Sequence, residues 1–298
     1  MTRRLCRQEI EQYHELGYVV LPELFGRERL DELRRENEAM VRAAAKVTVN
    51  DEVYDLEDSH DPANPRVRRI KTPHCWSAVF NALVSAPEIL DVLEPLIGPA
   101  IRLHGTKLNM KSAGYGAPVE WHQDWAVYPH TNDDVLATGL YLDDCEEGNG
   151  PLMVLPGSHK GPLYDHHAGG YFCGALDPAA SGLDFAKAAK LMGPAGSLTI
   201  HHVRAVHGSA INTSNRPRRL LLHEYAAADA WPLMGMRDSF EDFNARVVRG
   251  APTIEPRVTP GPVRMPLPPA PHQGSIYENQ KGAGRRFFSR LEEVRAAE

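Results

Sequence analysis

The stretch Ile101-Arg-Leu-His-Gly-Thr-Lys-Leu-Asn-Met110 alternates between apolar and polar residues, whereas the patterns before residue 100 are mostly helical. A period of two places successive side chains on opposite faces, which is typical of a β-strand with one buried face. Several short strands behind a helical N-terminal region predict a mainly β fold with flanking helices, arranged as an antiparallel barrel or jelly roll. Further strand candidates, separated by clusters of Gly, Asn, Asp and Pro, lie at residues 137–142, 197–202 and 219–225.

The N-terminal third carries the helical patterns. Residues 7–17 and 27–45 have apolar residues at helical spacing, and residues 76–98 look helical again. Residues 18–22 indicate a short strand between the first two helices. We therefore expect a single domain that comprises a helical region with a short strand (residues 1–99), a barrel core (100–226) and a segment that governs specificity or forms a lid (227–298).

Two irregular segments flank the predicted barrel. Residues 47–72 contain many acids, then prolines and the basic run Arg66-Val-Arg-Arg-Ile-Lys71, and predict a loop or hairpin over the mouth of the fold. Charge runs are usually solvated, so solvation of this run is favoured over contact with an anionic substrate. Residues 251–272 are too rich in proline for a central strand, and they predict either an extended surface segment or a lid.

The composition excludes several function classes. A formal net charge of -6 argues against nucleic acid as the main partner, and no apolar run approaches the roughly 20 residues that span a bilayer. The first residues lack the apolar stretch of a secretory signal, and the four cysteines have neither CxxC nor zinc-finger spacing. These features predict a cytoplasmic protein with a small-molecule substrate and no membrane partner. They leave its oligomeric state open.

A metal-binding pattern lies within the predicted barrel core, in the segment Glu120-Trp-His-Gln-Asp-Trp125. Residues two apart on a strand point to the same face, so His122 and Asp124 can reach one ion together. A histidine and an aspartate at this spacing occur often by chance. With one more histidine from another strand, they complete a facial triad of two histidines and one carboxylate, which suits Fe(II) oxygenases.

The third ligand is predicted at His207, which ends one strand before a turn rich in Gly, Asn and Ser. Iron that is chelated by 2-oxoglutarate requires a cation for the distal 5-carboxylate of that cosubstrate, and the fork of an arginine suits it. A hairpin would bring Arg218 back beside His207. Arg219 is an alternative, because a register shift of one residue moves every side chain of a strand to the opposite face. The sequence pattern alone therefore supports Arg218 and Arg219 almost equally as the residue that binds the 5-carboxylate.

Here the sequence resembles the phytanoyl-CoA dioxygenase family over about residues 8 to 226. This resemblance implies a double-stranded β-helix with a cupin-like barrel, Fe(II), and 2-oxoglutarate and O2 as cosubstrates. It favours Arg218 for the 5-carboxylate and implies that Ser209 and Asn109 also contact 2-oxoglutarate. The segments that carry the resemblance are Tyr-His-Glu-Leu-Gly-Tyr-Val-Val-Leu-Pro (13–22), Trp-His-Gln-Asp-Trp (121–125), Asn-Gly-Pro-Leu-Met-Val-Leu-Pro-Gly-Ser-His-Lys-Gly (149–161) and the stretch from His207 to Arg218.

The reaction expected from this resemblance is hydroxylation of an unactivated C–H bond in a small or medium-sized metabolite, with succinate and CO2 as co-products. No catalytic residue is expected beyond the metal ligands, and desaturation or cyclisation would be other outcomes of the same chemistry. The alternatives are a cupin-like oxygenase without 2-oxoglutarate, a non-catalytic binding barrel and a zinc hydrolase. His201 and His202 compete for the role of third ligand, but they lack the Gly-Ser turn and the arginine eleven residues later.

Overall fold

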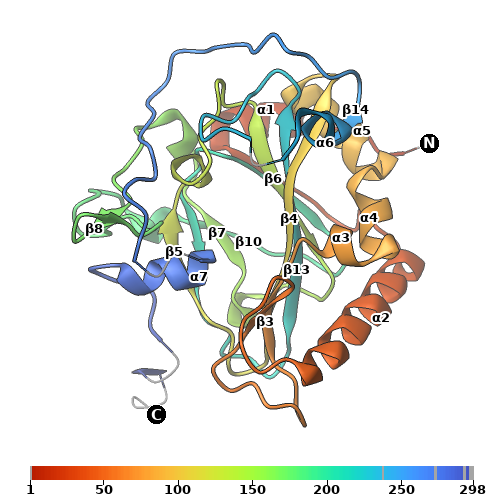
Figure 1. Ribbon diagram of the computed structural model, residues 1–298, viewed down its shortest axis with the longest axis vertical. Helices are drawn as coiled ribbons and strands as arrows, with labels where there is room; N and C mark the ends of the chain where they lie inside the picture. The colour runs from red at the N-terminus through yellow and green to blue at the C-terminus, as the bar shows by residue number, and fades with distance from the viewer. Residues whose placement is uncertain (1, 237, 272–273, 291–292, 295–298) are drawn as a thin grey trace.

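Two β-sheets form the centre of the fold (Figure 1), as seen in a computed structural model that describes residues 2–236, 238–271, 274–290 and 293–294. The larger sheet has the order β1-β11-β6-β13-β4-β3-β2, with β14 paired to β4, and the smaller has the order β10-β7-β12-β5. The expected mainly β jelly roll with flanking helices is confirmed. The strands of the larger sheet are β1 (Tyr18–Leu21), β2 (Tyr54–Leu56), β3 (Val67–Lys71), β4 (Ile101–Lys111), β6 (Val135–Tyr141), β11 (Leu198–His202), β13 (Arg218–Ala227) and β14 (Val247–Arg249). Those of the smaller sheet are β5 (Val119–His122), β7 (Leu152–Val154), β10 (Ala189–Leu191) and β12 (His207–Ser209), and β8 (His167–Ala168) pairs with β9 (Tyr171–Phe172).

Helices cover the outer face of the larger sheet (Figure 1). The alternation of β4 explains this arrangement, because Leu108 joins the buried apolar cluster with helix residues such as Phe80 and Leu93, whereas Lys107 and Asn109 face the interior of the barrel. No helix in the described ranges is long and apolar enough to cross a bilayer. The helices are α1 (Arg7–Leu16), α2 (Arg27–Ala43), α3 (Pro73–Trp76), α4 (Ala78–Val84), α5 (Pro87–Ile97), α6 (Phe240–Ala245) and α7 (Ile276–Asn279).

The N-terminal third differs from the sequence-based expectation in two ways. It contributes three strands to the larger sheet (β1, β2 and β3) rather than one. Residues 76–98 are largely helical as expected, but they form two helices, α4 and α5, that follow the short helix α3 rather than one continuous stretch. Ser77 caps the start of α4, its hydroxyl accepting a hydrogen bond from the Phe80 N–H, and Pro87 begins α5. A serine cap and a proline at the first turn are both helix start signals, and they outweigh the continuous apolar spacing.

The expectation that the basic run is solvated is also wrong. Residues 47–72 do form a hairpin, from β2 and β3, but this hairpin extends the larger sheet. Arg68 is buried and pairs with Glu57 at 3.1 Å. The carboxylate of Asp55 pairs with both Arg69 and Lys71, at 2.9 Å in each case. The alternation of β3 therefore places Arg69 and Lys71 on the inner face of the sheet, where they line a cavity.

The proline-rich segment runs in extended form over the surface (Figure 1), held by backbone bonds such as Arg257 N–H to Asp229 O and Thr259 N–H to Thr131 O. Of the two expectations for this segment, the structure shows the extended surface path for residues 251–271. Residues 272–273 lie outside the described residues. The chain then forms α7, and Ile276 and Tyr277 contribute to the wall of the cavity.

Candidate active site

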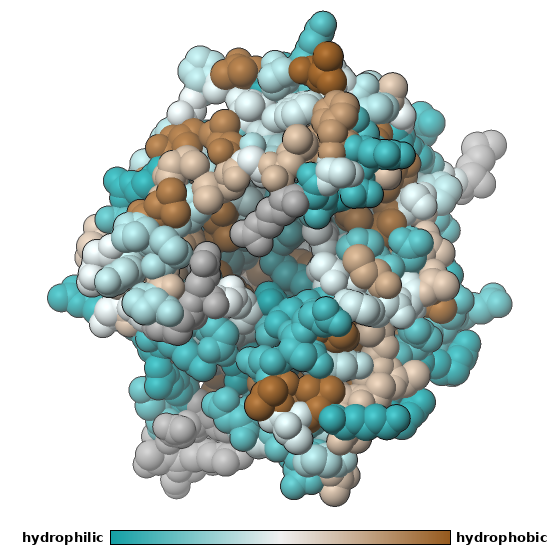
Figure 2. All heavy atoms as spheres, viewed as in Figure 1, coloured by the Kyte–Doolittle hydropathy of each residue, from teal (hydrophilic) through white to brown (hydrophobic). Residues whose placement is uncertain are grey.

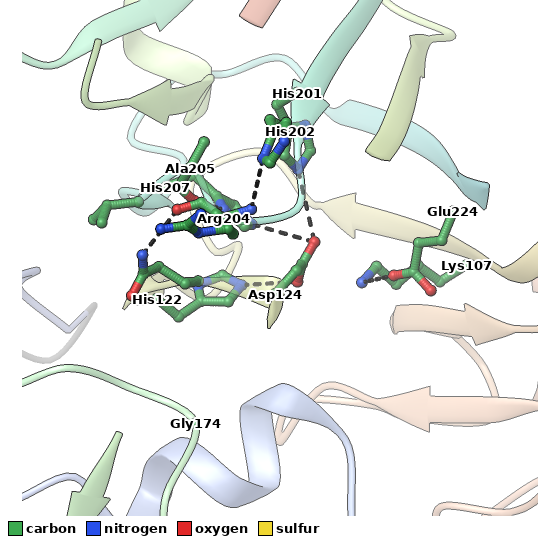
Figure 3. A network of polar contacts seen from close by, with 12 residues as sticks. Lys107, His122, Asp124, Gly174, His201, His202, Arg204, Ala205, His207 and Glu224 are labelled. Carbon is green, nitrogen blue, oxygen red and sulfur yellow. Dashed lines mark hydrogen bonds and ion pairs between the residues drawn. The ribbon is translucent and has the colours of Figure 1, made fainter. Parts of the chain in front are cut away.

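The predicted metal ligands converge at one end of the smaller sheet. His122 ends β5, and His207 begins β12 directly opposite it in the register of the two antiparallel strands. Asp124 follows immediately, in a short 3-10 turn (Asp124–Ala126) rather than in the strand itself. The turn still directs its carboxylate toward both histidines (Figure 3).

The three side chains fit a single metal ion. Their candidate ligand atoms all lie within 4.8 Å of one another. The Nε2 atom of His122 is 3.6 Å from Asp124 Oδ1, and that of His207 is 3.9 Å from Asp124 Oδ2. All three residues are buried.

Hydrogen bonds to backbone carbonyls fix the orientation of both imidazole rings. The Nδ1 atom of His122 lies 2.8 Å from Glu120 O, and that of His207 lies 3.0 Å from Ala205 O. Because a carbonyl can only accept, each Nδ1 carries the proton and each Nε2 presents a free lone pair toward Asp124. Burial, followed by the charge of His122, lowers the pKa of His207 well below its ordinary value. A neutral ring is the form that binds a metal.

The two competing histidines lie on opposite faces of β11. His201 faces the cavity, with its Nε2 3.8 Å from Asp124 Oδ2, and neither ring nitrogen has a hydrogen-bond partner among the described residues. His202 points the other way, packs against Tyr13 and His159, and accepts the Arg204 N–H at 3.1 Å. Only His207 of the three candidates joins the compact ligand set with His122 and Asp124.

The two candidate arginines also face opposite ways. Arg218 is 2% exposed and lines the cavity; its Nη2 donates to Gly150 O at 2.9 Å, while Nε and Nη1 have no partner within the described part of the chain. Arg219 forms a bidentate pair with Asp143, at 2.9 Å from Nε and 2.6 Å from Nη2. A buried guanidinium normally finds partners for its N–H groups. The free N–H groups of Arg218 are therefore suited to a carboxylate ligand, whereas the fork of Arg219 is already occupied.

Asn109 and Ser209 line the same cavity as Arg218 and the triad. Asn109 lies opposite Leu220 on β13, two residues along from Arg218, so both side chains point from the same face of the sheet. Its Oδ1 is buried without a partner among the described residues. Ser209 lies at the end of β12, two residues after His207, and is buried. The sequence-based site residues are thus brought together in one place.

The cavity that contains them has a volume of about 410 Å³. In Figure 2 the face shows a hollow near its centre, with hydrophilic side chains gathered over the β2–β3 hairpin below it. Several polar residues of the wall were not singled out from the sequence, although strand alternation could have found two of them. Lys107 shares its face of β4 with Asn109, and Glu224 shares its face of β13 with Arg218. The polar side chains that sequence reasoning missed include Lys107, Tyr128, Glu224 and Tyr277.

Comparisons with known proteins agree with this geometry. The family model described as phytanoyl-CoA dioxygenase matches residues 13–220. A protein of Stutzerimonas stutzeri, named a probable alpha-ketoglutarate-dependent hypophosphite dioxygenase, is 38% identical over 94% of this chain and 99% of its own length. The L-proline trans-4-hydroxylase of Streptomyces griseoviridis is 28% identical over 77% of this chain and 89% of its own. The crystal structure of EctD from S. alaskensis with 2-oxoglutarate and 5-hydroxyectoine shares the fold, with a TM-score of 0.64 and 24% identity over 87% of this chain and 88% of that one.

These findings confirm the expected cofactor chemistry. One relative is named as an alpha-ketoglutarate-dependent dioxygenase and another as a hydroxylase, and the buried triad and the unpartnered N–H groups of Arg218 fit iron and a dicarboxylate cosubstrate. The protein is an Fe(II)- and 2-oxoglutarate-dependent dioxygenase. With a match that covers more than half of its length, the chain belongs to the phytanoyl-CoA dioxygenase family.

Proposed function

We propose that His122, Asp124 and His207 hold Fe(II), and that Arg218 holds the 5-carboxylate of 2-oxoglutarate with help from Ser209 and Asn109. The observation that carries this proposal is the pair of unpartnered guanidinium nitrogens of the buried Arg218, Nε and Nη1, in the same cavity as the triad. Two imidazole nitrogens and one carboxylate oxygen leave coordination positions open for 2-oxoglutarate and O2. When bound, the iron couples oxidation of 2-oxoglutarate by O2 to oxidation of the substrate, with succinate and CO2 as co-products.

The side chains of the protein hold and orient the reactants. The carbonyls of Glu120 and Ala205 keep the Nε2 atoms of the histidines aimed at the metal position. A carboxylate that accepts hydrogen bonds from the unpartnered N–H groups of Arg218 would be held by charge-assisted bonds, which favour one direction as well as one position. Because Gly150 O already holds Nη2 of this guanidinium, its plane is set before the ligand arrives. These features support tight and oriented binding of 2-oxoglutarate.

The size of the cavity supports a small substrate. Ligand pockets are typically about 300–1,000 Å³, and this cavity of about 410 Å³ must hold the metal and 2-oxoglutarate as well. The relative that is 38% identical is named for hypophosphite, whose reactive bonds are P–H rather than C–H. We therefore propose hydroxylation of a small molecule, with hypophosphite as the first substrate to test.

Succinate formation by the iron-loaded protein is expected to rise at least about 10-fold over its substrate-free level when hypophosphite is added, with phosphite as the second product. L-Proline and ectoine, on which other relatives act, are the matched comparisons. Stimulation by L-proline or ectoine but not by hypophosphite would contradict this choice of substrate and leave the iron site unaffected.

We also propose that the C-terminal segment closes the cavity as part of the same domain. Gln280 exchanges hydrogen bonds with the backbone of Glu120, at 2.9 and 3.3 Å. The Glu120 carboxylate accepts the N–H groups of Phe287 and Phe288 at 2.9 and 3.4 Å, and both phenyl rings pack on Trp121. The C-terminal segment is thus hydrogen-bonded to β5, the strand that carries His122, and its residue Tyr277 lines the cavity.

Glu120→Gln is expected to make the C-terminal segment more sensitive to proteolysis and to raise the KM for 2-oxoglutarate. Charge-assisted hydrogen bonds are worth about 1.5–3 kcal/mol, so opening of the segment should become roughly 10- to 100-fold more frequent. The control is Glu278→Gln, which loses only an exposed pair with Lys281. Rates of proteolysis that are equal in the two variants would contradict the proposed closing role.

A further inference from the structure

The cavity carries a second charged cluster that neither iron nor 2-oxoglutarate requires. Lys107, Arg69 and Lys71 line the wall together with Glu224. Lys107 and Lys71 lie directly opposite each other on the paired strands β4 and β3, so their side chains share the inner face. The Nζ atom of Lys107 is 2.7 Å from Glu224 Oε1, and Figure 3 places this pair on the side of Asp124 away from His122.

The charges of this cluster do not cancel. Arg69 and Lys71 share a single carboxylate, that of Asp55, and Lys107 has that of Glu224. Three cations therefore face two carboxylates, which leaves one positive charge. Among the proposed groups of the iron site, Fe(II) and Arg218 would supply three positive charges, and Asp124 with the two carboxylates of 2-oxoglutarate would supply three negative ones. A substrate with one negative charge would therefore balance this cluster electrostatically.

The polar groups beside the triad also favour an oxyanion. An ammonium has three N–H donors, and Lys107 uses one for Glu224. Tyr128 lines the same cavity, and its phenol brings an O–H donor to this wall. An apolar chain at this position would lie against the Lys107–Glu224 pair and deprive both ions of solvent, whereas an oxyanion accepts hydrogen bonds from both donors.

We propose that Lys107 and Tyr128 bind the substrate directly, that Arg69 and Lys71 supply further positive charge, and that the substrate is a small oxyanion with a single negative charge. In this arrangement Glu224 occupies one N–H group of Lys107 and leaves the other two for the substrate. The inference rests on the proposed iron site and names the substrate class of that site. It also gives a role to the two inward-facing cations of β3, Arg69 and Lys71, at the cavity wall.

The test is an anaerobic titration of hypophosphite into the protein loaded with Fe(II) and 2-oxoglutarate, followed through the visible charge-transfer band of the bound cosubstrate. In the unaltered protein hypophosphite is expected to perturb the band, and L-proline is not. Lys107→Met should form the band normally but require about 10- to 100-fold more hypophosphite for the same perturbation. Lys107→Arg should recover part of the affinity, and Lys160→Met, which alters an exposed pair with Glu15, should behave as the unaltered protein.

Glu224→Gln separates anion binding from a purely structural role of the ion pair. Removal of this carboxylate increases the positive excess, so hypophosphite should bind as tightly as before or more tightly. If Lys107→Met and Glu224→Gln weaken hypophosphite binding equally, or if only L-proline perturbs the band, the anion site is overturned while the iron site stands. Absence of the band from the unaltered, iron-loaded protein would instead overturn the iron site, and the anion site with it.

Discussion

Asp124→Ala is expected to abolish both stable iron binding and turnover. Asp124 supplies the only carboxylate among the three side chains whose ligand atoms lie within 4.8 Å. Loss of a group that merely supports a ligand costs about 10- to 100-fold in metal affinity or activity, so loss of a ligand itself should lower kcat/KM by roughly 1,000-fold or more. Iron content after desalting and succinate formation together measure the effect.

A matched histidine control shows whether this effect is specific to the triad. His202 lies on β11 beside His201, but its ring packs against Tyr13 and His159 outside the cavity. His202→Asn should therefore retain iron and most of the activity, whereas His122→Ala and His207→Ala should behave like Asp124→Ala. Full iron binding by His122→Ala or by His207→Ala would contradict this ligand set. It would point to His201 as the ligand in place of the substituted histidine.

Arg218→Ala is expected to raise the KM for 2-oxoglutarate by roughly two to three orders of magnitude. Removing one partner of a buried ion pair costs about 3–5 kcal/mol, because the other charge is left without compensation, and each 1.4 kcal/mol is about tenfold in affinity. The guanidinium is 2% exposed, so water cannot replace it readily. Initial rates at a series of 2-oxoglutarate concentrations measure the change.

Arg219→Ala is the natural control, because the two arginines are neighbours in sequence but face opposite sides of β13. Arg219 pairs with Asp143 and lies near Glu38. Its loss should lower the thermal stability and leave the KM for 2-oxoglutarate within a few-fold of the original. An unchanged KM in Arg218→Ala together with a raised KM in Arg219→Ala would reverse the assignment.

The barrel strands and the His122–Asp124 pair could be predicted from local spacing, and His207 from the turn and the arginine that follow it. The alternation of residues 101–110 defines one face of β4, and two residues of separation bring His122 and Asp124 to one ion even though Asp124 lies in a turn. The choice between Arg218 and Arg219 depends on the strand register after an irregular turn. Pattern alone left that choice nearly even, and the paired strands β13 and β4 place only Arg218 in the cavity.

Other parts of the site depend on contacts between residues far apart in the chain. The ion pairs of Asp55 with Arg69 and Lys71 turn an apparently solvated basic run into part of the cavity wall. The hydrogen bonds between Gln280 and the backbone of Glu120 join segments that are 160 residues apart. Neither segment has a hydrophobic periodicity that would predict this contact. Lys107 and Glu224 could have been predicted from strand alternation. Lys107 shares its face of β4 with Asn109, and Glu224 shares its face of β13 with Arg218.

The most direct test of the iron and 2-oxoglutarate site is an anaerobic titration of the metal-free protein with Fe(II) and then 2-oxoglutarate, followed by visible absorbance. A charge-transfer band should appear with the unaltered protein, disappear in His122→Ala and weaken in Arg218→Ala. Iron bound at one equivalent without any such band on addition of 2-oxoglutarate would contradict the proposed site.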